Sequence, residues 1–137
     1  MISASNAPYF SKEECIEKYG ALLAEIMEYL CNENHPNLFL HGNGLLYTNG
    51  HDRAVTWMNS TANGRPVIPR TGYVVEINAL WYNALCFVAD LLGKEEYKEL
   101  AEKTGVSFIS TFLDVHSSPS CDHLHSPTNN RVRSRMC

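Results

Sequence analysis

The sequence lacks clustered positive charge and long apolar runs. Its 137 residues carry a net charge of −4, and the basic residues cluster only at Arg131, Arg133 and Arg135. Because nucleic-acid binding requires many Lys and Arg side chains on one surface, we expect no nucleic-acid partner. We find no apolar run of membrane-spanning length and no basic start followed by an apolar segment. We therefore expect neither a membrane span nor a signal peptide.

Regular cysteine spacing is also missing. The five cysteines are odd in number and follow no disulfide pattern. Three of them, Cys15, Cys31 and Cys86, fall within helical patterns, where a free cysteine behaves as a small hydrophobic residue. We predict a cytoplasmic protein with free thiols.

Three amphipathic or apolar segments predict helices. The first begins at a capping box, Ser11 to Glu14, and repeats apolar residues every three or four positions before ending between Asn32 and Pro36. The second covers about 76–92, is apolar nearly all round, and stops at Gly93, so we expect it to be buried on most sides. The third covers 95–113, and we expect Gly105 to interrupt it.

Two other segments lack helical periodicity. Glycine, proline and asparagine punctuate residues 37–71, which predicts a long functional loop, with short β-hairpin strands around 45–47 and 54–57 as an alternative. Residues 114–137 are rich in Ser, Pro, His, Asn and Arg and have no apolar period. We predict a folded unit over 1–113 and a disordered or non-native tail over 114–137.

The run 56–85, TWMNSTANGRPVIPRTGYVVEINALWYNAL, is the most informative part of the chain. It joins a polar loop to a helix and places aromatic rings beside amide, guanidinium and carboxylate groups. Such a mixture suits a sugar, whose apolar faces stack on rings and whose hydroxyls need convergent donors and acceptors. The candidate site residues are Trp57, Asn59, Arg70, Glu76, Asn78 and Trp81.

This run resembles the C-terminal glucosidase domain of the glycogen debranching enzyme family, the amylo-α-1,6-glucosidases. The resemblance covers residues 10–113 loosely and 44–85 closely. The matching residues are Gly44-Leu45-Leu46, Thr56-Trp57-Met58, Pro69-Arg70, Gly72 and Val75 through Leu85. It implies an all-α fold of the (α/α)6 toroid type, of which three helices and a long loop form only a fragment. It also implies hydrolysis of α-1,6-linked glucose at glycogen branch points, without a cofactor.

Catalysis requires two carboxyl groups in most glycosidases. The resemblance places a catalytic carboxyl at position 59, where this chain has Asn59, and a carboxamide cannot deliver a proton. Glu76 is the remaining acidic candidate, but the first turn of a helix favours its ionised form, which suits a hydroxyl acceptor. We therefore expect the isolated chain to be inactive.

Each candidate also has a structural alternative. Arg70 could clamp sugar hydroxyls or form a salt bridge with Glu76, which could itself cap its helix. Trp57, on the loop, is expected to stack on the sugar, whereas Trp81 is expected to serve the core or both roles. Asn78 lies nearer the loop than Asn83 and is the better candidate for a ligand contact.

Two further groups are weaker candidates. Cys121, His123, His125 and Cys137 could gather a zinc ion, but their spacing matches no standard zinc pattern, so we predict no metal site. His41, His51 and Asp52 accompany no nucleophile motif and are expected to be ordinary loop residues.

Two functions remain open at this point. The first is a glycoside hydrolase of the debranching type whose partner is an α-glucan. The second is a non-catalytic helical module that at most binds α-glucan or associates with itself through uncovered helix faces.

Overall fold

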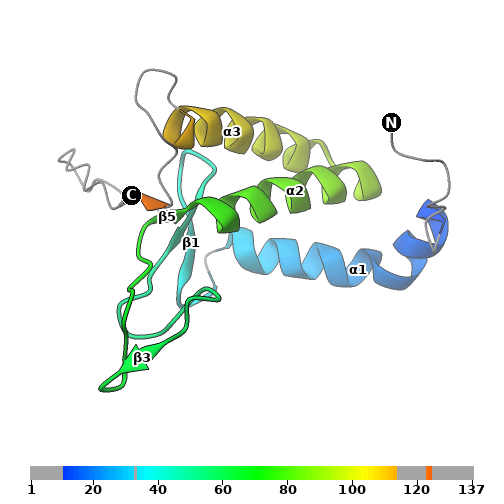
Figure 1. Ribbon diagram of the computed structural model, residues 1–137. Helices are drawn as coiled ribbons and strands as arrows, with labels where there is room; N and C mark the ends of the chain where they lie inside the picture. The colour runs from blue at the N-terminus through cyan, green and yellow to red at the C-terminus, as the bar shows by residue number, and fades with distance from the viewer. Residues whose placement is uncertain (1–10, 33, 114–122, 125–137) are drawn as a thin grey trace, which may run out of the picture.

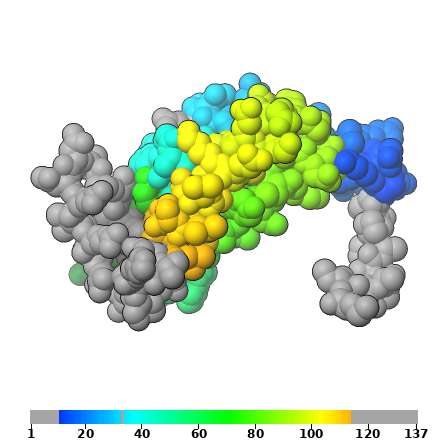
Figure 2. Space-filling view, turned by 90° about the horizontal axis from the view of Figure 1, so that it is seen from above, coloured from blue at the N-terminus to red at the C-terminus, as the bar shows by residue number. Residues whose placement is uncertain are grey.

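Three helices arranged side by side form more than half of the described part of the chain. The computed structural model describes residues 11–32, 34–113 and 123–124. The helices are α1 (Lys12–Cys31), α2 (Val75–Leu92) and α3 (Glu95–Phe112). Helix α2 packs against both α1 and α3, and the loops and strands gather at one end of this layer (Figure 1). The first turns of α1 project at the opposite end (Figure 2).

The helix ends follow the predicted signals. The Ser11 side chain accepts a hydrogen bond from the backbone of Glu14 at 3.2 Å, and the Glu14 carboxylate accepts one from the Ser11 backbone at 2.8 Å, which confirms the capping box. Helix α2 begins at Val75, one residue before the predicted start, and ends at Leu92. Gly93 caps it with a φ of +64°, the left-handed conformation that glycine adopts readily.

Gly105 does not interrupt α3, which is continuous from Glu95 to Phe112. A Cβ atom at Gly105 would lie 3.0 Å from the Tyr82 ring of α2. The missing side chain therefore permits a close approach of the two helices, and this approach explains the glycine better than the predicted break does.

Three short antiparallel pairs of strands accompany the helices in the described ranges of the chain. Strand β1 (Leu38–Leu40) pairs with β2 (Leu46–Thr48), β3 (Thr61–Ala62) with β4 (Arg65–Pro66), and β5 (Tyr73–Val74) with β6 (His123–Leu124). Strand β2 lies close to the predicted position. Residues 54–57 form no strand, and 56–57 lie in a bend, so a strand there was the wrong expectation. The second hairpin instead turns at Asn63-Gly64, where both residues have positive φ.

The described residues are mainly helical, as predicted, but their three small strand pairs depart from a strictly all-α fold. The toroid stays a prediction. Strand β6 falls within the predicted tail 114–137, and the rest of that tail lies outside the described residues.

One apolar core joins the helices to the first hairpin. Its centre is the inner face of α2, against which α1, β2 and α3 pack; the buried members are Met27, Leu46, Trp81, Leu85, Val88, Tyr97 and Ala101. A smaller cluster of Leu45, Tyr73 and Phe112 connects β5 to the end of α3. These two clusters hold the strands against the helix layer.

Helix α2 buries one face and exposes the other. Leu80 and Phe87 are exposed, at 66% and 51%, so the predicted burial on most sides is not reached among the described residues. By length and composition alone, α2 could also cross a membrane. The core helix of a globular protein can have the same length and apolar composition. The inner face of α2 packs against α1, β2 and α3, as the face of a core helix does.

Candidate functional site

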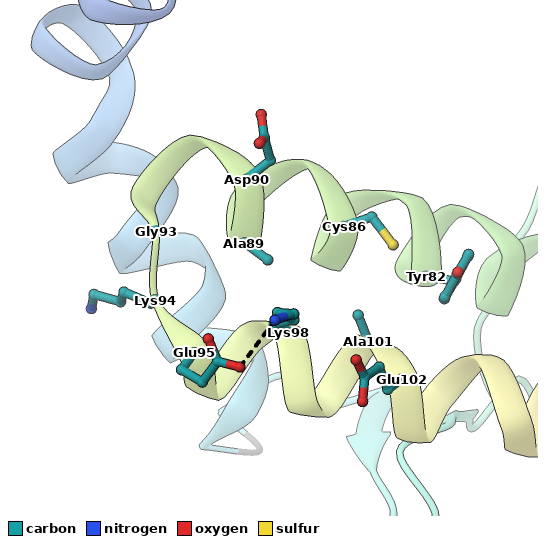
Figure 3. Close-up of a pocket in the computed structure, with 10 residues that line it drawn as sticks. All are labelled: Tyr82, Cys86, Ala89, Asp90, Gly93, Lys94, Glu95, Lys98, Ala101 and Glu102. Carbon is teal, nitrogen blue, oxygen red and sulfur yellow. Dashed lines mark hydrogen bonds and ion pairs between the residues drawn. The ribbon is translucent and has the colours of Figure 1, made fainter.

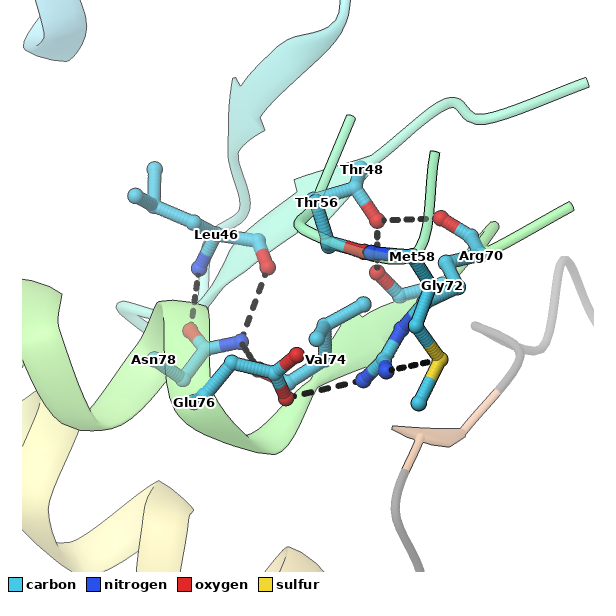
Figure 4. A network of polar contacts seen from close by, with 9 residues as sticks. All are labelled: Leu46, Thr48, Thr56, Met58, Arg70, Gly72, Val74, Glu76 and Asn78. Carbon is cyan, nitrogen blue, oxygen red and sulfur yellow. Dashed lines mark hydrogen bonds and ion pairs between the residues drawn. The ribbon is translucent and has the colours of Figure 1, made fainter. Parts of the chain in front are cut away.

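The two halves of the run 56–85 meet at one buried arginine. Arg70 is only 2% exposed, and its guanidinium donates to the Glu76 carboxylate at 2.8 Å and to the Met58 sulfur at 3.0 Å (Figure 4). Glu76 lies in the first turn of α2, and Met58 lies between Trp57 and Asn59 on the loop. Arg70 therefore connects the loop to the start of the helix.

The salt bridge between Arg70 and Glu76 is the structural alternative that the sequence left open. It is compatible with binding, because Glu76 remains one-third exposed, at 32%. The second carboxylate oxygen of Glu76, Oε1, is buried and accepts no hydrogen bond from the described residues. A buried acceptor without a partner is costly. A sugar hydroxyl reaches this oxygen only when the Glu76 side chain turns, since the atom itself has almost no contact with solvent.

The loop presents its aromatic ring to solvent. Trp57 is 74% exposed, and Asn59 is exposed as well. Two local contacts hold this turn: the Asn59 backbone donates to the Trp57 carbonyl at 2.9 Å, and the Met58 backbone donates to the Thr56 hydroxyl at 3.3 Å. An indole exposed to this degree offers a ring face for stacking.

Asn78 and Trp81 lie in the core, away from solvent. Asn78 is 0% exposed; its side chain accepts from the Leu46 backbone at 2.7 Å and donates to the carbonyls of Leu46 and Val74, each at 3.0 Å (Figure 4). Trp81 is 3% exposed and donates to the Gly44 carbonyl at 3.1 Å. Their burial agrees with the core role expected for Trp81 and gives Asn78 a structural role, whereas sugar contacts of either residue stay a prediction.

The loop histidines His41 and His51 differ in their burial and in their contacts. The ring of His41 stacks on Tyr47 and shares a hydrogen bond of 2.8 Å with the Tyr73 hydroxyl, to which Asn43 also donates. His51 and Asp52 are exposed. His41 therefore belongs to an aromatic cluster that braces the first hairpin.

A groove lies between α2 and α3, on a different part of α2 from the Arg70 contacts. It has a volume of about 490 Å³, and its lining carries charges of both signs together with Tyr82 and Cys86 (Figure 3). A side-chain hydrogen bond with the Cys86 thiol raises the pKa of the Tyr82 hydroxyl. A smaller groove of about 340 Å³ lies between α1 and α3, where burial raises the pKa of the Cys31 thiol.

Metal binding has no counterpart in the part of the chain that the structure describes, which contains no group of three His, Cys, Asp or Glu side chains able to hold an ion. The structure does not describe the side chains of the four residues considered above as zinc ligands, Cys121, His123, His125 and Cys137.

Residues 5–136 match the protein family described as amylo-alpha-1,6-glucosidase. Because the match covers almost the whole chain, the protein belongs to this family. No curated protein and no solved structure matches the chain. The family membership supports a role related to glycoside hydrolysis in glycogen debranching.

Proposed function

We propose that this chain provides part of a glucosidase site of the debranching type, which binds α-1,6-linked glucose at a glycogen branch. The observation that carries the proposal is the buried Arg70 that joins the exposed Trp57 loop to Glu76, in a chain of the amylo-alpha-1,6-glucosidase family. In this arrangement Trp57 stacks on the sugar ring and Glu76 accepts a hydroxyl. Arg70 fixes the distance between them.

The proton-donor position of the proposed site is Asn59. An amide can hold a hydroxyl but cannot protonate the leaving oxygen, so the chain binds a glucan without hydrolysing it. The (α/α)6 toroid implied by the family resemblance would bring further helices, and with them a second carboxylate, to the opposite wall. In an inverting glycosidase the two carboxyl groups stand about 6.5–9.5 Å apart.

Fluorescence titration with isomaltose and maltotriose tests the binding step. The chain has two tryptophans, one exposed and one buried, so a sugar that stacks on Trp57 changes the emission of the exposed one. Trp57→Ala removes this fluorescent reporter, so its binding is measured by isothermal titration calorimetry. It should be about tenfold weaker, as expected for the loss of about 1.4 kcal/mol of stacking. Tyr29→Ala removes an exposed aromatic ring from α1 and is the matched control. If neither sugar binds the intact chain at millimolar concentration, the proposal is wrong.

The proton-donor position has a separate test. Asn59→Asp restores a carboxyl group at an exposed position, so it should leave the fold unchanged. Glucose release from a branched limit dextrin by Asn59→Asp, but not by the parent chain, would support the assignment. Sugar binding without glucose release is the expected result if the second carboxylate comes from further helices. Loss of sugar binding in Asn59→Asp with an unchanged circular dichroism spectrum would contradict the assignment.

A second candidate function is self-association, which the exposed apolar residues of the helices favour. Leu80 and Phe87 on α2 and Val106 and Ile109 on α3 are all more than half exposed. Burial of such side chains contributes roughly 25 cal/mol for each Å² of apolar surface, which favours association. Light scattering should show a mass that rises with concentration, and Leu80→Glu should lower it. A constant mass of 15.4 kDa would refute this candidate.

A further inference from the structure

Strand β2 contacts the backbone of Arg70 directly. The Thr48 side chain is completely buried, and its hydroxyl lies within hydrogen-bond distance of the Arg70 carbonyl, at 2.8 Å, and the Gly72 carbonyl, at 3.0 Å (Figure 4). The backbones of Thr48 and Gly72 also exchange two hydrogen bonds of 2.9 Å. The segment before α2 is thereby fixed on both sides of Thr71.

Gly50 extends this contact by two residues. Its backbone donates to the Thr71 hydroxyl at 3.0 Å, and a Cβ atom at this position would lie 2.8 Å from the Arg70 oxygen and 2.9 Å from the Arg70 nitrogen. Real Cβ atoms essentially never approach backbone atoms so closely, so any larger residue would displace Arg70. Thr48 and Gly50 together form what we term the arginine seat.

We propose that the arginine seat, Thr48 with Gly50, positions the Arg70 guanidinium and so sets the relative placement of the Trp57 loop and Glu76. The physical reason is that Arg70 connects these two segments through its side chain and has its backbone held by the seat. A shift of the Arg70 backbone moves the guanidinium away from Met58, from Glu76 or from both. The consequence for sugar binding rests on the proposed function, whereas the placement of Arg70 does not.

The chain offers a matched control for the Thr48 hydroxyl. Thr104 on α3 is also completely buried, and its hydroxyl lies 2.8 Å from the Gly44 carbonyl and 2.7 Å from the Leu100 carbonyl. Thr48→Val and Thr104→Val each remove one buried hydroxyl and add one methyl group. We therefore expect comparable decreases in the midpoint of thermal unfolding. Of these two threonines, Thr48 is the one whose hydroxyl contacts the Arg70 backbone.

The methyl group of Met58 reports the position of Arg70 without any ligand. In the complete chain labelled with ¹³C-methyl methionine, Met58→Leu identifies the Met58 resonance, and Arg70→Lys gives its position when the guanidinium contact is lost. Thr48→Val should move the resonance towards the Arg70→Lys position, and Thr104→Val should not. Thr48→Ser retains the hydroxyl, so the Met58 resonance of this variant should lie where it lies in the parent chain. Gly50→Ala tests the arginine seat sterically and should also move the Met58 resonance. If Thr48→Val does not fold, Gly50→Ala decides whether the seat positions Arg70.

An unchanged Met58 resonance in folded Thr48→Val, or an equal shift in Thr104→Val, would overturn the arginine seat. A parallel titration with maltotriose should show about tenfold weaker binding for Thr48→Val and unchanged binding for Thr104→Val. If the intact chain binds no sugar while the Met58 resonance responds as expected, the proposed function fails and the positioning of Arg70 stands. If Thr48→Val moves the resonance but binds maltotriose as tightly as the intact chain, the seat does not serve the sugar site.

Discussion

Replacing Asn78 with leucine should destabilise the fold strongly. Asn78 is 0% exposed and makes three hydrogen bonds, two with the backbone of Leu46 and one with the carbonyl of Val74. These bonds connect α2 to β2, two elements that no other described side-chain hydrogen bond links directly. Leucine has a similar size but neither donates nor accepts, so Asn78→Leu removes all three bonds and leaves the space filled.

The expected cost follows from the number of bonds. A net contribution of about 1 kcal/mol for each hydrogen bond gives roughly 3 kcal/mol, and the buried backbone groups left without a partner raise this towards 4 kcal/mol. Since 1.4 kcal/mol corresponds to a factor of ten, the unfolded fraction should rise by about two to three orders of magnitude. A domain of ordinary stability would lose a large part of its free energy of unfolding.

Urea unfolding followed by far-UV circular dichroism measures this cost. Asn83 is the matched control, because it is the same residue type on the same helix but is exposed. Asn83→Leu should change the free energy of unfolding by less than about 0.5 kcal/mol. A result in which Asn78→Leu and Asn83→Leu unfold at the same urea concentration would refute the structural role of Asn78.

Three further predictions concern separate parts of the chain. Glu76→Gln should lower the free energy of unfolding by about 1–3 kcal/mol, because the buried Arg70 loses its counter-charge while Glu76 is partly exposed; exposed Glu99→Gln is the control in thermal unfolding. Ser11→Ala should cost about 1 kcal/mol in urea unfolding through loss of the capping box, and no change would contradict the N-cap. Iodoacetamide at pH 8 should alkylate exposed Cys86 faster than Cys31, whose raised pKa leaves less thiolate, and mass spectrometry of peptides would reveal the opposite order.

The helices could be predicted because their signals are local. The capping box at Ser11, the stop at Gly93 and the apolar repeats each act within a few residues, and the structure has helices at those places. The strands were harder to predict because each is only two or three residues long, too short for an alternating pattern. The dipeptide Asn63-Gly64 is a strong hairpin signal, but the predicted strands lie elsewhere.

The site residues divide according to how far away their partners lie. The pair Arg70 and Glu76, six residues apart, could be foreseen as a salt bridge from the sequence. The partner of Asn78 is Leu46, 32 positions earlier, and no local pattern indicates it. The contacts of Thr48 and Met58 with Arg70 likewise depend on tertiary packing, so sequence reasoning missed both residues.

The run 56–85 therefore combines two physical tasks in one stretch of sequence. Trp57, Asn59 and part of Glu76 face solvent, where they can meet a ligand, whereas Asn78 and Trp81 attach the same stretch to the first hairpin. From sequence alone, polar and aromatic residues that bind a ligand cannot be distinguished from those that stabilise the fold, because a buried amide or indole also needs a hydrogen-bond partner. Burial separates the two sets. Substitutions of the buried residues should change stability first, and substitutions of the exposed ones should change sugar binding at constant stability.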